Sequence, residues 1–391
     1  MTPAARLQAA AEILDEVISS ARDDGPPADS IVTRYFKARR YAGSKDRRAV
    51  RELVFRAIRR SGERPVSGRA AILGLADAEP DLEALFGETR GPELRADGEQ
   101  GASASLVPSW IECEIDPLVT SAEWPALLER APLDLRVNVA RTEREAMLAA
   151  FAGAEPTPLS PWGIRVPPET RVDESAPYLD GLVEVQDEGS QLIALACGLS
   201  DGETAIDLCA GAGGKSLALA AAAPAAAILA TDSNRQRLSK LAPRADRAGA
   251  SIASKLLNPP NELSELSDWL GKADVVLVDA PCSGSGTWRR NPEGRWRLTP
   301  DRLDRVTALQ QRLLDIGAEL VRPGGRLIYA VCSILSREGA GAIDAFQSRR
   351  SSWMKEEPLI TAGRPSGEGR LLSPGHDGTD GFFIARLRRP C

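Results

Sequence analysis

From about residue 182 to the end of the chain, short apolar runs alternate with segments of helical pattern. The runs occupy residues 183–185, 205–208, 227–230, 275–278, 327–331 and 382–385. Such alternation is typical of a mostly parallel β-sheet that is covered by helices on both faces. The chain is therefore predicted to contain an α/β domain, and in a sheet of this kind ligands bind beyond the carboxyl ends of the strands.

The first 70 residues have a different pattern, with apolar residues at helical spacing in two stretches, residues 7–18 and 50–58. This part carries 15 Lys and Arg residues against 9 Asp and Glu, although the whole chain has a net charge of −6. The arginines around the second stretch are interpreted either as a solvated helix face or as a surface that contacts phosphates. The candidates for RNA binding on this helix are Arg47, Arg48 and Arg51.

Several classes of protein are excluded by what the sequence lacks. The only histidine is His376, and none of the six cysteines forms a CxxC pair, so we expect no metal site. No run of about 18 apolar residues is present, so we expect no membrane partner. The first residues lack the basic head and apolar run of a secretory signal, so we expect reduced thiols and a cytoplasmic location.

A glycine-rich loop from Cys209 to Ser216 follows the second apolar run. An ATP-binding P-loop would need glycine at Cys209, and the GxGxxG fingerprint of dinucleotide sites fits Gly211 and Gly213 but fails at Ser216. S-adenosylmethionine (SAM) needs only a close approach to the backbone and an acid for its ribose hydroxyls, and Asp232 ends the next run. A tight turn without any ligand is the remaining alternative.

Two cysteines and an acid follow the later strands. Asp279 and Cys282 come directly after the run at 275–278, and Cys332 follows the run at 327–331. Carbon 5 of a pyrimidine is a poor nucleophile until a thiolate adds to carbon 6, and an acid near ring nitrogen 3 stabilises the resulting charge. Two buried structural cysteines are the plainer reading, but a pair at two strand ends beside an acid favours methyl transfer to carbon 5.

Arginines and tryptophans alternate shortly after Cys282. Such a run suits single-stranded nucleic acid, because aromatic rings stack on bases and guanidinium groups meet phosphates. A packed loop with exposed arginines is the alternative. The RNA-binding candidates here are Trp288, Arg289 and Arg290.

Four motifs in order, at 209–216, 279–286, 329–333 and 380–383, resemble the Sun/Fmu (RsmB-type) family of SAM-dependent ribosomal RNA cytosine-5 methyltransferases. The resemblance implies a class I SAM-dependent methyltransferase fold, which is Rossmann-like with a mostly parallel sheet. It also implies an all-α NusB-like RNA-binding domain and a small α+β linking subdomain before it. The expected boundaries are 1–125 for the helical domain, 126–182 for the linking subdomain and 183–391 for the catalytic domain.

The same resemblance implies that Cys332 attacks carbon 6, that Cys282 assists product release and that Asp279 contacts the base. In DNA cytosine-5 methyltransferases the cysteine after proline is the nucleophile, which would select Cys282, but the second cysteine argues against that choice. The residues expected to hold SAM are Cys209, Ala210, Gly211, Ala212, Gly213, Gly214, Lys215, Asp232, Asn258 and Asp279. The expected reaction methylates carbon 5 of a cytosine in RNA, with 16S ribosomal RNA as the expected substrate and a monomer as the expected state.

Four features depart from the usual pattern of the family. Gly211 and Ala212 replace Ala and Pro in the loop, and Val331 replaces the Thr before the nucleophile. Asn258 stands where the family has an Asp near the adenine, and Gly339 replaces an Asn. A non-catalytic RNA-binding or ribosome-assembly factor that keeps the fold is therefore one alternative. A methyltransferase for a small molecule or a protein is another, and the basic head and the Trp/Arg run argue against it.

Overall fold

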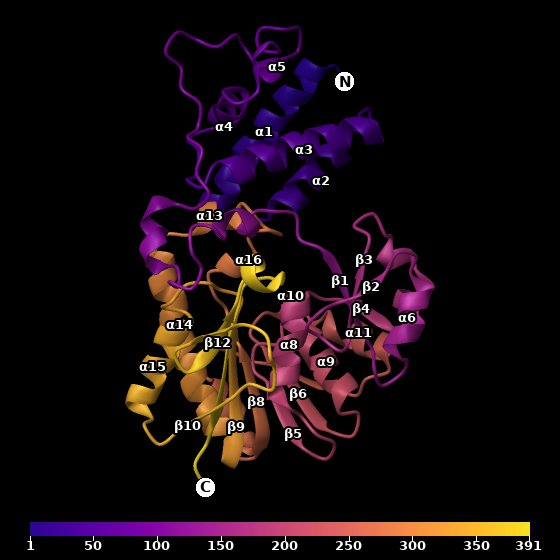
Figure 1. Cartoon of the computed structure of the whole chain (residues 1–391), viewed down its shortest axis with the longest axis vertical. Helices are drawn as coiled ribbons and strands as arrows, with labels where there is room; N and C mark the ends of the chain where they lie inside the picture. The colour runs from indigo at the N-terminus through magenta and orange to yellow at the C-terminus, as the bar shows by residue number, and fades with distance from the viewer. The chain divides into compact units, whose positions relative to one another are not determined.

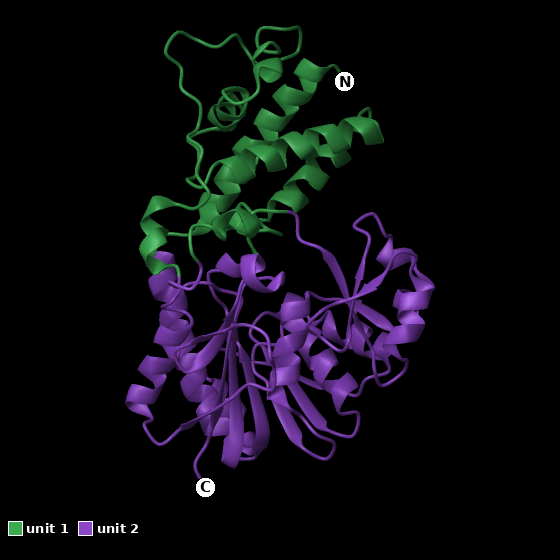
Figure 2. Cartoon of the chain, viewed as in Figure 1, with its two compact units in different colours: residues 1–115, 120–129, 287–300 green, residues 116–119, 130–286, 301–391 purple.

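The computed structural model describes residues 1–391 (Figure 1). The chain forms two compact units, and Figure 2 shows them in different colours. The first unit contains residues 1–115, 120–129 and 287–300. The second contains residues 116–119, 130–286 and 301–391. The segment 287–300 thus belongs to the first unit, although it follows the second cysteine motif in sequence, and boundaries drawn along the chain do not capture this.

The first unit is helical, as the spacing of its apolar residues predicted. Its longest helix, α1, begins with a favourable cap, since the Thr2 hydroxyl accepts the N–H of Ala5 and Pro3 occupies the first turn. Its helices are α1 (Pro3–Arg22), α2 (Ala28–Ala38), α3 (Ser44–Arg60), α4 (Gly68–Ala76), α5 (Pro80–Glu83), η1 (Ser109–Glu114), η2 (Trp124–Leu127) and α13 (Gly294–Arg297). Leu7 and Leu14 of α1 are fully buried in one core with Val54 and Ile58 of α3.

The segment 287–300 supplies part of the interior of this helical unit. Trp296 is only 2% exposed within the same core, and its Nε1–H donates to the carbonyl of Ser61 at 2.8 Å. Arg295 is 1% exposed and donates to the carbonyls of Ile58 at 2.6 Å and Leu106 at 2.5 Å. These bonds tie the segment 287–300 to the end of α3 and to the loop that carries Leu106.

A small antiparallel sheet lies in the second unit, with strand order β2-β3-β1-β4. Its elements are β1 (Leu133–Val137), α6 (Arg144–Ala150), β2 (Glu155–Pro156), β3 (Gly163–Val166), η3 (Val172–Glu174), α7 (Ala176–Leu179) and β4 (Val183–Val185). The prediction that residues 183–185 join the main sheet is wrong, because Val185 pairs with Leu135 and Val183 pairs with Val137. A three-residue apolar run cannot specify which sheet it enters.

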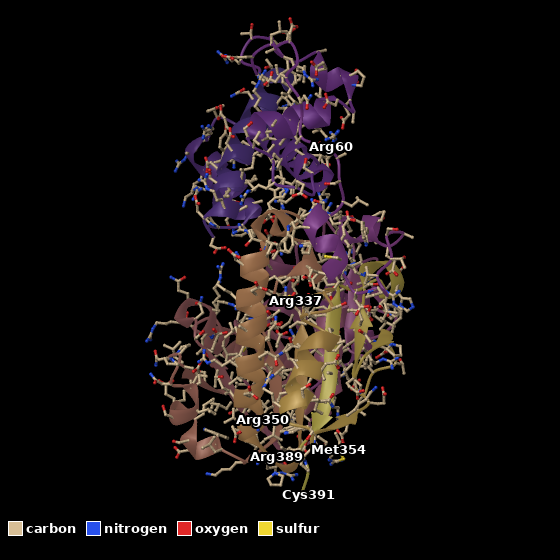
Figure 3. The ribbon with its side chains drawn as sticks, turned by 90° about the vertical axis from the view of Figure 1, so that its left-hand side faces the viewer. Arg60, Arg337, Arg350, Met354, Arg389 and Cys391 are labelled. Atoms are coloured by element: carbon tan, nitrogen blue, oxygen red, sulfur yellow. The ribbon has the colours of Figure 1, made fainter.

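The main sheet has nine strands, in the order β11-β12-β13-β9-β8-β5-β6-β7, with β10 on β13. Strands β7, β6, β5, β8 and β9 run parallel, and β13 is antiparallel to β9. The strands are β5 (Thr204–Asp207), β6 (Ala227–Asp232), β7 (Ala253–Leu256), β8 (Ala273–Asp279), β9 (Val321–Val331), β10 (Met354–Glu356), β11 (Arg364–Ser366), β12 (Gly369–Leu372) and β13 (Phe382–Arg388). Figure 3 shows Met354 and Arg389 close to Cys391, where β10 pairs with the end of β13.

Helices cover both faces of this sheet. Val275 and Leu277 of β8 pack in one core with residues of α8 and α9. The alternate residues Val276 and Val278 face Gly317 of α14 on the other side. The helices of this unit are α8 (Glu188–Cys197), α9 (Gly214–Ala222), α10 (Arg235–Leu238), α11 (Leu241–Ala248), α12 (Glu262–Glu265), η4 (Ser267–Trp269), η5 (Ser285–Thr287), α14 (Pro300–Leu320), α15 (Ala340–Arg349) and α16 (Pro374–Asp377).

The direction of chain progression reverses at β5, because β6 lies on one side of it and β8 on the other. Ligands bind at such a switch point, beyond the carboxyl ends of the strands. The carboxyl ends of β5, β6, β8 and β9 carry the glycine-rich loop and three of the predicted site residues, Asp232, Asp279 and Cys332. None of the helices combines the length and apolar character needed to cross a membrane.

The burial of Trp296 yields a prediction for the helical unit. Trp296→Ala should cost about 3–5 kcal/mol of its stability, because a large core side chain is lost and a cavity remains. Hydrogen exchange should accelerate at the amides of α1 and α3 and stay unchanged in β5 and β8. Trp269→Ala, at a half-exposed tryptophan of η4, is the matched control. Equal protection of α1 in Trp296→Ala and in the wild-type protein would show that the segment 287–300 is not part of that core.

Candidate active site

The glycine-rich loop joins β5 to α9, as predicted. Gly211 and Gly213 have φ values of +57° and +82°, a region that side chains with a Cβ rarely adopt. A Cβ on Gly213 would also lie 2.1 Å from Cδ1 of Leu241. The two glycines therefore allow the loop to turn tightly into the N-terminus of α9.

Asp232 ends β6 and is held by this loop. Its carboxylate is 7% exposed and accepts the N–H of Gly211 at 2.7 Å and the N–H of Asn234 at 2.6 Å. These bonds fix the carboxylate at the carboxyl end of β6, where an acid could bind a pair of ribose hydroxyls.

Asp279, at the end of β8, forms an ion pair with Lys215 of α9. The Lys215 Nζ lies 2.6 Å from Oδ2 of Asp279, and the two side chains are 12% and 28% exposed. Burial works against the charge of Lys215, but Asp279 outweighs it and raises the pKa of the ammonium group. Lys215 therefore stays charged and fixes the direction of the Asp279 carboxylate.

The two predicted thiols meet. Cys282 follows β8, Cys332 follows β9, and their Sγ atoms are 3.2 Å apart as free thiols. The hydrogen bond to Cys332, together with burial, raises the pKa of Cys282 well above its usual value. Cys282 therefore stays protonated and can donate a hydrogen bond to a thiolate at Cys332.

One cavity of about 620 Å³ brings most of these groups together. The predicted site residues among its lining are Cys209, Asp232, Asp279, Cys282 and Cys332. The volume lies in the range of small-molecule and cofactor sites. An adenosine-sized ligand such as SAM fits the space, the backbone loop and the ribose-binding position of Asp232.

Asn258 lies outside the lining of this cavity, as do residues 210–215 of the glycine-rich loop. Its side-chain amide donates to Oε1 of Glu265 and its backbone N–H to Oε2, both at 2.9 Å. The cavity is lined by its neighbours, Leu257 and Pro259, and Asn258 is not among the lining residues. Glu265 thus engages both donors of Asn258, and the contact of Asn258 with adenine stays a prediction.

The structure adds residues that sequence reasoning missed. Arg237 of α10 lines the cavity, and its guanidinium packs so closely on Gly211 that a Cβ there would lie 2.4 Å from Nη2. Arg312 of α14 lines the cavity too and is paired with Glu262. No local motif marks these arginines, since only the tertiary packing of their helices brings them to the cavity.

The fourth motif, at 380–383, contacts the Cys282 loop directly. The N–H of Gly381 donates to the carbonyl of Gly286 at 2.8 Å, and a Cβ on Gly286 would lie 1.9 Å from the carbonyl oxygen of Gly381. The N–H of Gly286 in turn donates to the carbonyl of Cys332 at 3.0 Å. The backbone of all three segments is thus packed together without room for a side chain on Gly286.

The arginines of α3 divide into two groups. Arg48 is exposed, and Arg47 and Arg51 are also exposed although Arg47 donates to the Ala42 carbonyl and Arg51 pairs with Asp29. At the other end of α3, Arg59 and Arg60 bind carbonyls of their own unit, Leu128 and Ala102 (Figure 3 labels Arg60). RNA binding by the exposed group remains a prediction.

The prediction for the Trp/Arg run is wrong for Trp288 and Arg289. Trp288 is 1% exposed and Arg289 is 6% exposed, so the ring has no free face on which a base could stack. Both residues belong to the segment 287–300 of the helical unit. Only Arg290 is half-exposed, and its contact with RNA stays a prediction.

Residues 194–388 match the family described as 16S rRNA methyltransferase RsmB/F. The chain is 32% identical over 305 residues to the ribosomal RNA small subunit methyltransferase B of Enterobacter sp. (strain 638). The aligned region covers 75% of this chain and 69% of that protein.

Two crystal structures share the fold. That of PH0851 has a TM-score of 0.77 at 21% identity and covers 100% of this chain and 99% of its own. NSun6 from Pyrococcus horikoshii with SFG, a SAM analogue, has a TM-score of 0.60 at 19% identity and covers 68% of this chain and 92% of its own.

The parallel sheet with its switch point, the glycine-rich loop and the acid after β6 define a class I SAM-dependent methyltransferase. Together with the family match and the relative covered over two thirds of its length, they identify the family. This chain belongs to the RsmB/F family of 16S rRNA methyltransferases.

Asp207, at the end of β5, gives a prediction on pH dependence. Burial raises its pKa from 3.8 to about 7, although the Ser216 hydroxyl donates to it at 2.6 Å. Because the folded pKa exceeds the unfolded one, Asp207 favours folding below pH 3.8, and this contribution is lost as the pH rises to about 7. Asp207→Asn should therefore gain stability relative to wild type by up to about 1.4 kcal/mol per pH unit up to pH 7 and then level off.

Urea denaturation of both proteins between pH 5 and 9 measures this difference in the free energy of unfolding. Asp268→Asn, at an exposed aspartate of η4, is the control and should show no such trend. A difference for Asp207→Asn that stays constant over this range would contradict the assignment.

Proposed function

We propose that this chain transfers a methyl group from SAM to carbon 5 of a cytosine in 16S ribosomal RNA, through a covalent bond to Cys332. The observation that carries the proposal is the 3.2 Å separation of the Cys282 and Cys332 sulfurs in the cavity that Asp232 and Asp279 also line. The RNA substrate is supported by the named activity of the relative from Enterobacter.

The residues of the chain divide the chemistry between them. The Cys332 thiolate forms a bond to carbon 6, and the electron pair of the 5,6 double bond moves to carbon 5, which becomes enamine-like. When bound, SAM supplies the methyl group on a positively charged sulfur. Asp279 contacts the base as a hydrogen-bond acceptor, and the Lys215 ammonium paired with it supplies the positive charge that stabilises the negative charge developing on the ring.

Release of the product needs a base near carbon 5. Once the methyl group is in place, the proton on carbon 5 must leave, the 5,6 double bond re-forms and the bond from Cys332 to carbon 6 breaks. Cys282 is next to Cys332 and gives up its proton reluctantly. Once Cys332 is bound to carbon 6, Cys282 can release its proton to water, and its thiolate then accepts the carbon 5 proton while Cys332 leaves carbon 6 as a thiolate.

A target base inside a helix cannot reach these thiols, so it must be unpaired or turned out of its stack at a cost of a few kcal/mol. The exposed arginines Arg47, Arg48 and Arg51 are proposed to bind phosphates of the same RNA. We further propose that the enzyme acts as a monomer in the cytoplasm, where reducing conditions keep both thiols free.

A non-catalytic RNA-binding protein remains the second candidate. Val331, which is fully buried, offers no hydroxyl beside Cys332, where the family has a threonine. The side chain of Asn258 is engaged by Glu265. Transfer of tritium from labelled SAM to unmodified ribosomal RNA distinguishes the two: label on the RNA supports the enzyme, and RNA binding without transfer supports the alternative.

Substitution of the two thiols tests the mechanism. Cys332→Ala should lower methyl transfer by about 10³-fold or more, because no thiolate can add to carbon 6. Cys282→Ala should accumulate a protein–RNA adduct that survives denaturing electrophoresis, because elimination stalls. Cys113→Ala, at an exposed cysteine of the helical unit, is the control and should behave as wild type. Full activity of Cys332→Ala would overturn the assignment of the nucleophile.

A further inference from the structure

Glu338 follows β9 and Cys332 and lies in the turn before α15. The chemistry proposed for the two thiols gives it no role. Its side chain is fully buried. A buried carboxylate is costly unless hydrogen bonds compensate for the lost water. The donors that surround Glu338 come from the two cysteine loops and from α14, which makes their identity informative.

We propose that Glu338 is a positioning residue that ties the two cysteine loops together and so sets the separation of the Cys282 and Cys332 sulfurs. Its Oε2 accepts the hydroxyls of Ser283 and Ser333, the latter at 2.5 Å. Its Oε1 accepts the backbone N–H of Ser283 at 2.7 Å. Ser283 directly follows Cys282 and Ser333 directly follows Cys332, so a single carboxylate holds the residue next to each thiol.

Gln310 of α14 extends the clamp to the other side of Cys282. Its Nε2 donates to Oε1 of Glu338 at 2.9 Å and to the carbonyl of Pro281 at 3.0 Å. The residues before and after Cys282 are therefore both fixed by the same pair of buried side chains. Gln310 is itself fully buried, so its amide cannot exchange these partners for water.

The backbone around Glu338 is fixed as well. The hydroxyl of Tyr329, in β9, donates to the carbonyl of Glu338 at 2.8 Å. Ser285 of the Cys282 loop lies 3.0 Å from the Ser333 hydroxyl and accepts the N–H of Ile334 at 3.0 Å. The carboxylate is thus the centre of a polar network in which each loop supports the other.

Loss of this carboxylate removes the acceptor of the Ser283 backbone N–H and of the Ser283 and Ser333 hydroxyls, and an unsatisfied buried donor costs about 1–3 kcal/mol. The loops would relax to find other partners, and the thiols would move with them. A displacement of about 1 Å at a reacting group can lower the rate by about 10²-fold. The hydrogen bond to Cys332 and burial raise the pKa of Cys282, and the negative charge of Glu338 raises it further.

Kinetics with Glu338→Ala test the clamp. The kcat for methyl transfer should fall by about 10²-fold, while KM for SAM changes by less than about twofold, because the residue touches neither ligand. Glu338→Gln should retain activity within about tenfold of wild type, since its carbonyl can still accept from Ser283 and Gln310. Glu203→Gln is the matched control at a partly buried glutamate that pairs with Arg326, and it should leave both constants unchanged.

A second measurement reads the thiol separation without catalysis. Phenylarsine oxide condenses with two thiols and releases water, and one arsenic atom can bridge only sulfurs that lie close together. Mass spectrometry of the digested protein should find the peptides of Cys282 and Cys332 bridged in the wild type, in Glu338→Gln and in Glu203→Gln. The bridge should be lost or strongly reduced in Glu338→Ala.

The outcomes separate this inference from the proposed function on which it rests. Unchanged kcat and normal bridging in Glu338→Ala contradict the clamp, even if Cys332→Ala is inactive as proposed. If Glu338→Ala loses bridging and the wild-type protein shows no methyl transfer activity, the clamp is supported and the proposed function is contradicted. If Glu338→Ala fails to fold, Glu338→Asp, which keeps the charge but is one methylene shorter, takes its place with the same expected loss of kcat and bridging.

Discussion

The pairing of β8 with β9 is the interaction on which the site depends. The two strands are parallel neighbours, with Asp279 opposite Ala330, so the loops that follow them leave the sheet at the same height. Cys282 and Cys332 are three and two residues beyond this pair. A shift in this register would move one thiol along the sheet by about 3.3 Å per residue and separate the sulfurs.

Pairing of the strands alone does not hold two thiols at 3.2 Å. The ion pair of Lys215 with Asp279 fixes the acid beside them, and the Glu338 network fixes the loops that carry them. The close contact between Gly286 and Gly381 adds a third constraint from the segment just before β13. The charges of Lys215, Asp279 and Glu338, which would be costly in isolation, are each paired with a neighbour, and together they hold the groups around the cavity in place for a covalent reaction.

Much of this site was predictable because it follows from strand ends. Parallel strands place their carboxyl ends at one edge, so Asp232, Asp279, Cys282 and Cys332 could be expected to converge once the strands were found. The glycine-rich loop could be predicted from its glycines, since Gly211 and Gly213 adopt the positive φ that the turn requires. These features depend on local sequence and on one general rule of α/β sheets.

The features that the sequence did not predict have non-local causes. Trp288 lies in the segment 287–300, which belongs to the helical unit, and Trp296 of this segment completes a core whose other residues precede it by more than 200 positions. Asn258 is held by Glu265, a contact that a motif comparison does not contain.

The most direct test of the mechanism identifies the cysteine that binds RNA carrying 5-fluorocytidine, whose fluorine prevents loss of a proton from carbon 5. Mass spectrometry of the wild-type adduct, formed with SAM, should find the methylated nucleotide on the peptide of Cys332, and attachment at Cys282 or the absence of any adduct would contradict the account.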